Sequence, residues 1–592
     1  MSWQDGLIFG LKAFAVVMFA MNVAVILTWA DRRQGAMIQD RVGPNRAVAW
    51  LPTKVVQALL LLPALGVAAL VIFLAATSDV SGPARGERAM LWAHLAILMT
   101  WLTGVIIAGR VRARGVKSSF DRFMAALGDP RNIFYGGIAA HLLIAVVGGM
   151  TQGSEAGETL REVGYRSGPA VLAFVIAGGA AYAVYSIRNE PRIGLRLAGL
   201  LHPAADGLKT MFKEDFVPPN ADRFLHGLAP FISFFPALVV LAVVPFGDTL
   251  CFGTTDGSID FGALAAVVPQ SGVCTEGAVS LQVVDLNIGI LYFFALAGTG
   301  IVGAALAGWA SDNKFSLLGG LRAASQMVSY EVTLGLTIIG AVMIYGTLRI
   351  DEMVRWQGEH AWGIFVQPLA FFLFFAASVA EAKRIPFDIP EGESEIVAGY
   401  FTEYSGMKFA MFFFSEYIAV VTSSALMVAL FLGGWQLPFL DRNGLHVVIG
   451  ETAYFSQTLS HLAVVLIGVL AFVLKTIALC SLQLAIRWTL PRFRYDQLMR
   501  LGWRKLLPAS LVNILLTGLI VLAVQAAGPS IGASLAIIGD LTEAVLAVAG
   551  IAGAVAFVLF LLKPAQKRRY LVSTSQQYAA AAGGTRTARM GA

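Results

Sequence analysis

Long apolar segments constrain this chain more than any other feature of its sequence. Thirteen stretches of about 18–29 residues carry few charges, and each could cross the roughly 30 Å of membrane hydrocarbon as a helix. A backbone in lipid must satisfy its own polar groups, which a helix does. The sequence therefore predicts an all-α integral membrane protein with about 13 transmembrane helices, near residues 7–29, 55–76, 90–109, 133–150, 169–187, 226–246, 287–308, 327–346, 365–382, 409–433, 460–486, 507–526 and 534–562.

The distribution of positive charge predicts the orientation of these helices. If the N-terminus lies outside, 34 of the 43 lysines and arginines fall in inside segments, seven fall outside, and only Lys12 and Lys475 lie within spans. Such an excess marks the cytoplasmic side. We therefore expect a multi-pass protein of the bacterial inner membrane with its C-terminus in the cytoplasm. The net charge of +6 then reflects topology rather than nucleic-acid binding.

The N-terminus and the cysteines limit other interpretations. The opening MSWQDG lacks a basic region, so we expect no cleaved signal peptide. The three cysteines lack the close spacing typical of metal sites, so no metal is expected. Cys251 and Cys274 share the outside loop 247–286, an oxidising location, and a disulfide between them is expected, although sequence does not give their separation.

An acidic loop, residues 383–408, interrupts the basic pattern of the inside segments. It carries five acids against three bases, whereas every other inside segment is net positive. Pro386, Pro390, Gly392 and Gly399 prevent one regular helix. The loop could be a solvated surface or the wall of a proton-handling or ligand-binding cavity, and its unusual charge favours the cavity. Its acids are Asp388, Glu391, Glu393, Glu395 and Glu403, with Glu381 at the mouth.

Glu331 and Lys475 are the costliest of the charges that lie inside predicted spans. Glu331 is about one turn inside its span, which makes it a site candidate. Lys475 either pairs with a carboxylate or extends toward the interface. We expect both to face the protein interior in a shared polar network, because lipid would leave each charge unpaired.

Two arginine-rich segments lie at the inside interface. Arg41 and Arg46 flank a Gly-Pro turn, which presents fixed positive charge or anchors the chain in the usual way. Arg492 and Arg494 belong to WTLPRFRYDQLMRLGW, a basic interfacial segment with aromatic anchors.

Several long motifs together resemble one family. RVGPNR, ADGLK, KEDFVP, AGWASDNKFSLLGGLRAASQMVSYE, PFDIPEGESEIVAGYFTEYSGMKF and LPRFRYDQLM resemble the NuoH-type membrane subunit of respiratory complex I, proton-pumping NADH:quinone oxidoreductase. The resemblance implies a protein that forms much of the quinone chamber and couples quinone reduction to proton translocation. It assigns no single catalytic residue. It implies a quinone cavity at Arg41, Arg46, Asp388, Glu391, Glu393, Glu395 and Glu403, and proton coupling at Glu331, Glu381 and Lys475.

The resemblance also implies the cofactors and partners. The substrate would be ubiquinone or menaquinone, and this chain would bind no metal or covalent cofactor. The terminal iron–sulfur cluster would lie in a partner of the hydrophilic arm, and small membrane subunits would adjoin this chain in the bilayer.

The chain departs from the family pattern in length. We expect a core of eight helices, formed by a first helix and interfacial loop in 1–46 together with 195–527. An inserted four-helix unit would occupy 47–194, and an extra helix with a basic tail would occupy 528–592. The inserted unit should lie on the periphery, since the core must keep its usual packing.

Three alternatives remain. The homologous membrane subunit of an energy-converting hydrogenase or formate hydrogenlyase shares some motifs but lacks a quinone. A secondary transporter often contains inverted repeats, and no internal repeat is evident. A structural anchor would not need Glu331 or the acidic loop.

Overall fold

The computed structural model divides the chain into two compact units. One unit comprises residues 1–47 and 198–553, and the other comprises residues 48–197 and 554–592. The structure describes residues 3–39, 49–58, 192–195, 199–251, 253–255, 258–260, 278–390, 396–442, 444–449 and 452–527, with scattered positions at 43, 44, 47, 61, 65, 66, 69, 392, 539, 542, 544–546 and 548–550.

The first unit is a bundle of apolar helices. Within the described residues, seven helical segments are long and apolar enough to cross a membrane. An all-α membrane protein was predicted, and this is confirmed. The seven segments contain α1 (Trp3–Ile38), α8 (Arg223–Val239) with the 3-10 turn η2 (Val240–Val243), α9 (Gly289–Ala310), α10 (Lys314–Tyr345), α15 (Gly406–Phe431), α16 (His461–Thr489) and α17 (Tyr495–Leu501) continuing through the π-helical turn η5 (Gly502–Leu506) into α18 (Leu507–Ala527).

The span predicted at 365–382 is shorter than expected. The helix α13 covers only Pro368–Glu381, and a separate turn, α12 (Gly363–Val366), precedes it. Pro368 disfavours a helical backbone at Gln367, which adopts φ −132° and ψ 57°. With 14 residues, α13 extends about 21 Å, so it does not cross the hydrocarbon unaided.

The helix α10 begins well before the span predicted at 327–346. The side chain of Asn313 caps its first turn by accepting a hydrogen bond from the backbone N–H of Phe315 at 2.8 Å. The helix ends at Gly346, whose left-handed backbone (φ +69°) a glycine adopts without strain. The more polar first turns of α10 therefore lie in the same helix as Glu331.

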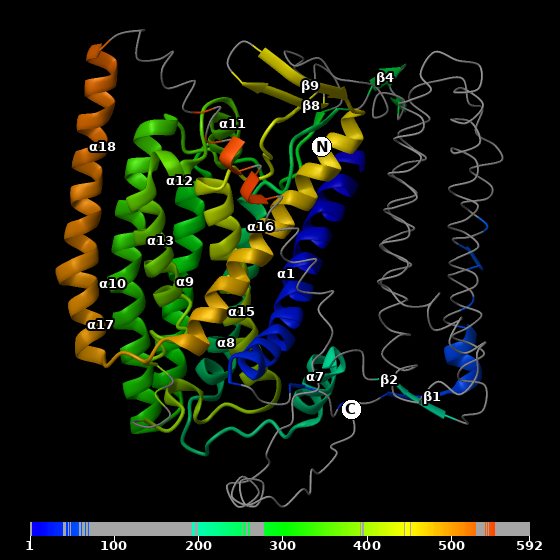
Figure 1. Cartoon of the computed structure of the whole chain (residues 1–592). Coiled ribbons are helices and arrows are strands. Elements are labelled where there is room, and N and C mark those ends of the chain that lie inside the picture. Colours follow the sequence, from blue (N-terminus) through cyan, green and yellow to red (C-terminus); the bar gives the residue numbers. More distant parts are fainter. Residues whose placement is uncertain are drawn as a thin grey trace, which may run out of the picture. The chain divides into compact units, whose positions relative to one another are not determined.

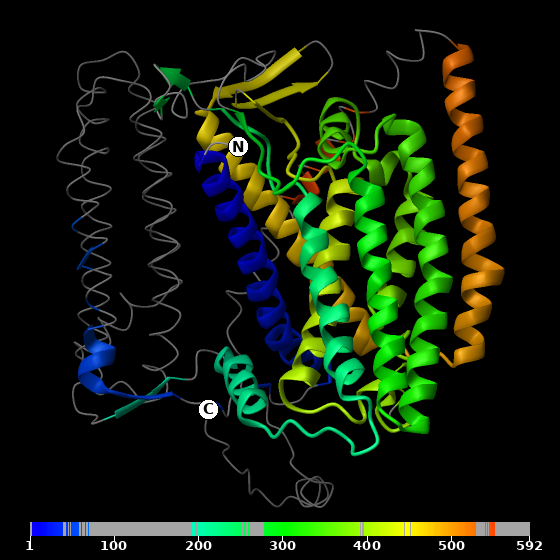
Figure 2. The same cartoon turned by 180° about the vertical axis from the view of Figure 1, so that it is seen from behind.

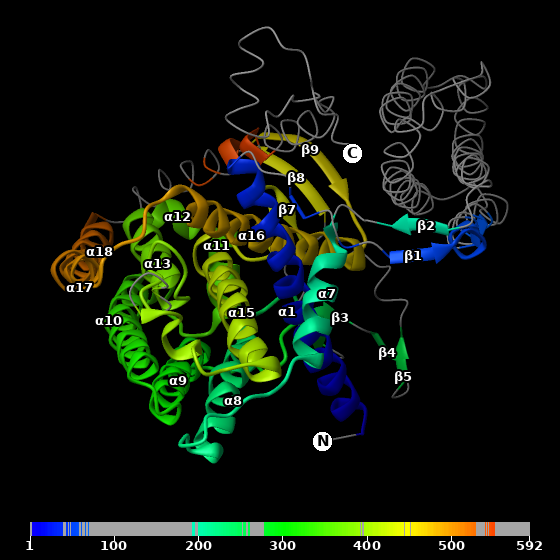
Figure 3. The same cartoon turned by 90° about the horizontal axis from the view of Figure 1, so that it is seen from below.

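The helix α15 lies at the centre of the bundle (Figures 1 and 3). Most of its side chains are buried. It contacts α1, α8, α13 and α16, while α9 and α10 pack beyond α8 and α13. The helix α18 lies at one edge, packed on α10 and α13 (Figure 2). Because α15 is surrounded by protein, polar side chains on it face other helices rather than lipid.

The bundle has two different ends. We call the end that carries the acidic loop the inner end; α7 (Leu201–Phe212) lies there, as does α17 (Figure 1). The outer end carries α11 (Ile350–Glu359) and small antiparallel sheets. These sheets are β3 (Leu250–Cys251) with β6 (Ala278–Val279), β4 (Gly253–Thr255) with β5 (Ser258–Asp260), and β7 (Leu440–Asp441), β8 (Gly444–Ile449) and β9 (Thr452–Thr458) in that order.

The second unit is described only in part. Its strands β1 (Ala49–Pro52) and β2 (Arg192–Leu195) pair antiparallel, with Ala49 opposite Leu195. The spans predicted at 90–109, 133–150 and 169–187 lie outside the described residues, as do most of 55–76 and 534–562. The peripheral placement of the inserted helices stays a prediction.

Candidate functional site

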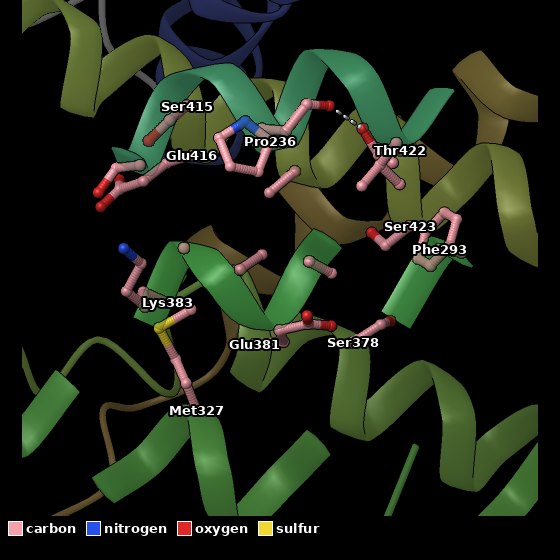
Figure 4. Close-up of a pocket in the computed structure, with 17 residues that line it drawn as sticks. Pro236, Phe293, Met327, Ser378, Glu381, Lys383, Ser415, Glu416, Thr422 and Ser423 are labelled. Carbon is pink, nitrogen blue, oxygen red and sulfur yellow. Dashed lines mark hydrogen bonds between the residues drawn. The ribbon is translucent and has the colours of Figure 1, made fainter. Parts of the chain in front are cut away.

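A cavity lined by both polar and apolar residues lies inside the first unit, between α8, α9, α10, α13 and α15 (Figure 4). Its volume is about 80 Å³. Glu381 and Ser378 enter it from α13, and Glu416 from α15. The remaining polar lining is Ser233, Lys383, Ser415, Thr422 and Ser423, and the apolar lining includes Pro236, Phe293 and Met327. A cavity of this volume with these polar groups can hold ordered water, since one molecule needs at least about 10–15 Å³.

Four of the five hydroxyl groups that line the cavity are arranged as acceptors. Ser378, Ser415, Thr422 and Ser423 each donate to a backbone carbonyl three or four residues earlier in their own helix, at 2.7–3.2 Å. Their protons are therefore used within the helix, and their lone pairs remain for groups in the cavity. Water molecules and protonated carboxyls can donate to them.

Glu416 is the most strongly bonded carboxylate of the cavity. It is 2% exposed, lies 3.6 Å from the Arg384 guanidinium, and accepts a hydrogen bond from the Tyr400 hydroxyl at 3.3 Å. Tyr400 in turn accepts a hydrogen bond from the Lys383 ammonium at 2.9 Å. Two cations from the acidic loop thus compensate a carboxylate on a membrane helix, as a buried charge requires.

The backbone of Lys383 is unusual. Its φ of +54° is left-handed, a conformation that favours glycine, and it follows directly after the end of α13. This conformation occurs where the chain leaves the helix and starts the acidic loop. The buried contact with Tyr400 offsets its cost and keeps the ammonium at the cavity wall.

Glu331 and Glu381 form the other acidic part of the site. They lie near enough for the two carboxylates to interact electrostatically. Glu331 faces α9, because a Cβ placed on Gly298 would lie 2.6 Å from its Oε1 atom. Glu331 on α10 is therefore an electrostatic neighbour of the cavity acid Glu381, although Glu331 does not itself line the cavity.

Asp388 lies further along the acidic loop and pairs with Arg492 of the basic interfacial segment. Its Oδ2 atom accepts from Arg492 at 2.8 Å, and the rings of Phe387 and Phe493 stack beside this pair with centroids 5.4 Å apart. Burial raises the pKa of Asp388 to about 7, although Arg492 opposes this shift. Among the described residues Oδ1 has no hydrogen-bond partner. Asp388 can therefore change its charge near neutral pH.

Two predicted site residues lie outside this arrangement. Glu403 accepts a hydrogen bond from the Asn313 side chain at 2.7 Å and so ties the acidic loop to the turn between α9 and α10. Lys475 donates to the backbone carbonyls of Leu432, Gly434 and Gln436 at 2.6–3.1 Å. The expectation that Lys475 shares a polar network with Glu331 is therefore wrong, because carbonyls at the outer end of α15 bind its ammonium.

The other predicted residues fall into two groups. Arg494 caps α17 at the inner surface, where the Gln497 side chain accepts from its backbone N–H at 3.1 Å. The rest lie outside the described residues: Arg41, Arg46, Glu391, Glu393 and Glu395. Their place in a quinone cavity stays a prediction.

The structure adds charged residues that sequence reasoning did not select. Glu416 lies in the apolar run FFFSEYIAVV, so the criterion that selected Glu331 would also have found it. Asp31, Lys383 and Arg384 lie in loop-like or terminal positions, where a charge carries no signal of burial. All three are at most 7% exposed.

Cysteines and metal sites complete the description. Cys251 is disulfide-bonded, and Cys480 is a buried free thiol. Cys274 is not among the described residues. Within the part of the chain that the structure describes, no cluster of His, Cys, Asp or Glu could hold a metal ion.

The fold and the cavity define the class of protein first. An apolar helix bundle that encloses carboxylates, each with a nearby cation or acid, is a multi-pass membrane protein with functional charges in its interior.

Comparison with known proteins then identifies the family. The family model for NADH dehydrogenase matches residues 170–518. The H 2 subunit of NADH-quinone oxidoreductase from Geobacter metallireducens is 43% identical over 360 residues, which cover 59% of this chain and 93% of that protein. The H 1 subunit from Cytophaga hutchinsonii is 41% identical over 351 residues (58% and 92%), and the H subunit from Flavobacterium johnsoniae is 37% identical over 363 residues (60% and 94%).

The chain belongs to this family, the H-type membrane subunits of NADH-quinone oxidoreductase. The resemblance inferred from the sequence motifs is confirmed, and other subunits of the enzyme are its partners.

Proposed function

We propose that this chain forms the inner part of the quinone chamber and couples quinone reduction to proton transfer through the cavity around Glu381 and Glu416. One observation carries the proposal: the acidic loop places Lys383 in the cavity wall, pairs Arg384 with Glu416, and pairs the buried Asp388 with Arg492. A charge change on one side of the loop can therefore alter the pairing of carboxylates on the other side.

The size of the cavity assigns it to protons rather than to the quinone. Pockets that bind small organic ligands are usually about 300–1,000 Å³. A cavity of about 80 Å³ holds a few water molecules instead. The quinone head group would bind on the side of the loop that carries Asp388 and Arg492, and water in the cavity would carry protons between carboxylates.

The chemistry of the substrate fits this division. Quinone reduction takes up two electrons and two protons, so negative charge develops at the head group before protons arrive. Nearby carboxyls whose charged form is already costly respond to such a change by taking up or releasing protons. Arg384 and Lys383 limit that cost when Glu416 is ionised.

The wider setting follows from the same family. The substrate would be ubiquinone or menaquinone, with no metal or covalent cofactor in this chain. A protein of the hydrophilic arm would carry the terminal iron–sulfur cluster, and small membrane subunits would adjoin the bundle. The charge distribution supports a bacterial inner membrane with the N-terminus outside and the inner end cytoplasmic. The relatives are named as NADH-quinone enzymes, so no observation favours a hydrogenase.

The test is neutralisation of the cavity acids in the assembled enzyme. Glu416→Gln and Glu381→Gln keep shape and remove charge. NADH oxidation by an artificial acceptor, which does not use the quinone site, should survive, whereas quinone reduction or proton translocation should fall on the order of tenfold or more. Glu359→Gln is the matched control, because Glu359 is exposed at the outer end of α11.

The decisive measurement is the ratio of quinone-reductase to artificial-acceptor activity, together with proton translocation, in fully assembled membranes. If both stay at the control value in both cavity variants, the proposal is wrong. The same activity ratio tests five further predicted residues, Arg41, Arg46, Glu391, Glu393 and Glu395. If these residues line the chamber, neutralising each of them should lower quinone reduction.

A further inference from the structure

A second buried acid, Asp31, lies at the inner end of α1. Its side chain is 7% exposed, and three side chains donate to its carboxylate. Trp488 Nε1 donates to Oδ1 at 2.8 Å, Tyr417 Oη donates to Oδ2 at 2.9 Å, and the Arg487 guanidinium also bonds Oδ2. We call these four residues the Asp31 cluster. It joins α1 to α15 and α16.

The helices α1 and α16 pack closely around the cluster. Gly35, one turn after Asp31, lies against the Trp488 indole, where an added Cβ would come within 2.6 Å of the ring. Gln34 also reaches α16, donating to the Ser481 carbonyl at 3.3 Å. The carboxylate is thus held on a fixed helix face, and its hydrogen bonds are charge-assisted, which makes them strong.

The cluster touches the cavity through one residue. Tyr417, whose hydroxyl bonds Asp31, presents its ring to the Arg384 guanidinium, which lies 4.0 Å from the ring centroid. The same guanidinium pairs with Glu416 at 3.6 Å. Tyr417 and Glu416 are neighbours in sequence on α15, so Arg384 is held from both sides by adjacent residues of one helix.

From this geometry we propose that Asp31 is a positioning residue for Glu416. By fixing the Tyr417 hydroxyl, Asp31 fixes the ring on which Arg384 rests, and Arg384 in turn compensates the Glu416 carboxylate. Asp31 does not line the cavity and does not touch a reacting group. The inference rests on the proposed role of Glu416 in proton coupling.

The physical reason lies in the geometry of a cation over an aromatic ring. Its attraction depends on the position of the ring, and burial makes it stronger. A ring that is held only by packing can tilt, whereas the Tyr417 ring is also fixed by the hydrogen bond from its hydroxyl to Asp31. Without Asp31, Arg384 has a less defined position, and Glu416 loses part of its compensation.

The experiment combines variants of Asp31 and Glu416 in the full enzyme complex. Asp31→Asn should lower quinone reduction relative to artificial-acceptor activity on the order of tenfold. A functional group such as Glu416 loses about that much rate when it is misplaced by a fraction of an ångström. Asp31→Glu keeps the charge and should restore most of the activity. Tyr417→Phe keeps the ring but loses the hydroxyl, and should resemble Asp31→Asn.

The double variant Asp31→Asn/Glu416→Gln separates positioning from general stability. If Asp31 acts through Glu416, the double variant should be no worse than Glu416→Gln alone. The KM for a soluble quinone analogue should stay unchanged. Asp285→Asn is the matched control: it makes the same chemical change in an ion pair at the outer end, where Asp285 is 45% exposed and Arg349 also reaches Asp351.

Each outcome is decisive. Additive losses in the double variant, or a raised KM with unchanged kcat, would overturn the inference and leave the proposed function standing. No effect of Glu416→Gln alone would also overturn the inference, whereas no effect of either Glu416→Gln or Glu381→Gln would overturn the proposed function. If Asp31→Asn prevents assembly, the comparison of Tyr417→Phe with Tyr417→Phe/Glu416→Gln makes the same distinction.

Discussion

The ammonium of Lys475 lies 4.0 Å from the ring centroid of Trp362, at the outer end of α15. Gly433 and Gly434 have left-handed backbones, with φ of +69° and +52°, where the chain turns away from the helix. This turn brings the carbonyls of Leu432, Gly434 and Gln436 to the lysine. A cation at a helix C-terminus complements the helix dipole. Lys475 therefore caps α15 from a neighbouring helix.

A structural role for Lys475 predicts a loss of stability rather than of coupling. Lys475→Met should leave carbonyls unpaired, each at a cost of about 1–3 kcal/mol, and lower the Tm of the purified complex. Lys475→Arg should lower it less. The folded fraction should keep its ratio of quinone-reductase to artificial-acceptor activity. An unchanged Tm with lost proton translocation would instead support the coupling role expected from the sequence.

The contact between Gly298 and Glu331 predicts a selective effect of a single methyl group. Gly298→Ala would place its Cβ 2.6 Å from Glu331 Oε1, so the carboxylate must move. We expect quinone-coupled proton translocation to fall severalfold, with assembly preserved, because the far end of the side chain can shift. Gly227→Ala on the neighbouring helix α8 meets no atom within 4 Å, does not line the cavity, and is the matched control. Equal translocation in the two variants would contradict a role for Glu331.

The raised pKa of Asp388 predicts a pH dependence near neutrality. With a pKa of about 7, this carboxyl is about 10% ionised at pH 6 and about 90% at pH 8, and only the ionised form pairs fully with Arg492. Asp388→Asn should therefore match the wild type at pH 6 and fall below it at pH 8 in quinone reduction. Asp496→Asn, in an exposed pair with Arg500, is the control. A constant ratio of variant to wild type from pH 6 to 8 would refute this.

The turn at Gly399 predicts a strong structural effect. Its φ is +56°, and an added Cβ would lie 1.7 Å from the Pro390 carbonyl oxygen. Gly399→Ala should displace the acidic loop and lower the amount of assembled complex severely. In α10, Gly335→Ala meets no atom within 4 Å and should be neutral or stabilising by about 0.5–1 kcal/mol. Normal assembly of Gly399→Ala, measured by native gel, would show that the loop tolerates another path.

The sequence determined the class of protein, the family and most helix positions within the part of the chain that the structure describes. Long apolar runs require helices in lipid wherever they occur, so α9, α15, α16 and α18 begin and end within a few residues of the predicted spans. Local chemistry also places the ends of helices, as at Asn313 and Gly346. Where the prediction failed, at 365–382, the cause was also local: Pro368 restricts the residue before it.

Only the tertiary structure decided which charges work together. Asp31 and Arg487 are 456 positions apart, and Asp388 and Arg492 are 104 apart, so no sequence pattern joins them. Lys475 looked like a partner for a carboxylate because both are costly in lipid, yet backbone carbonyls satisfy it. The cost of a buried charge follows from its sequence context, but its partner depends on which helices meet, as where α15 packs against α1, α8, α13 and α16.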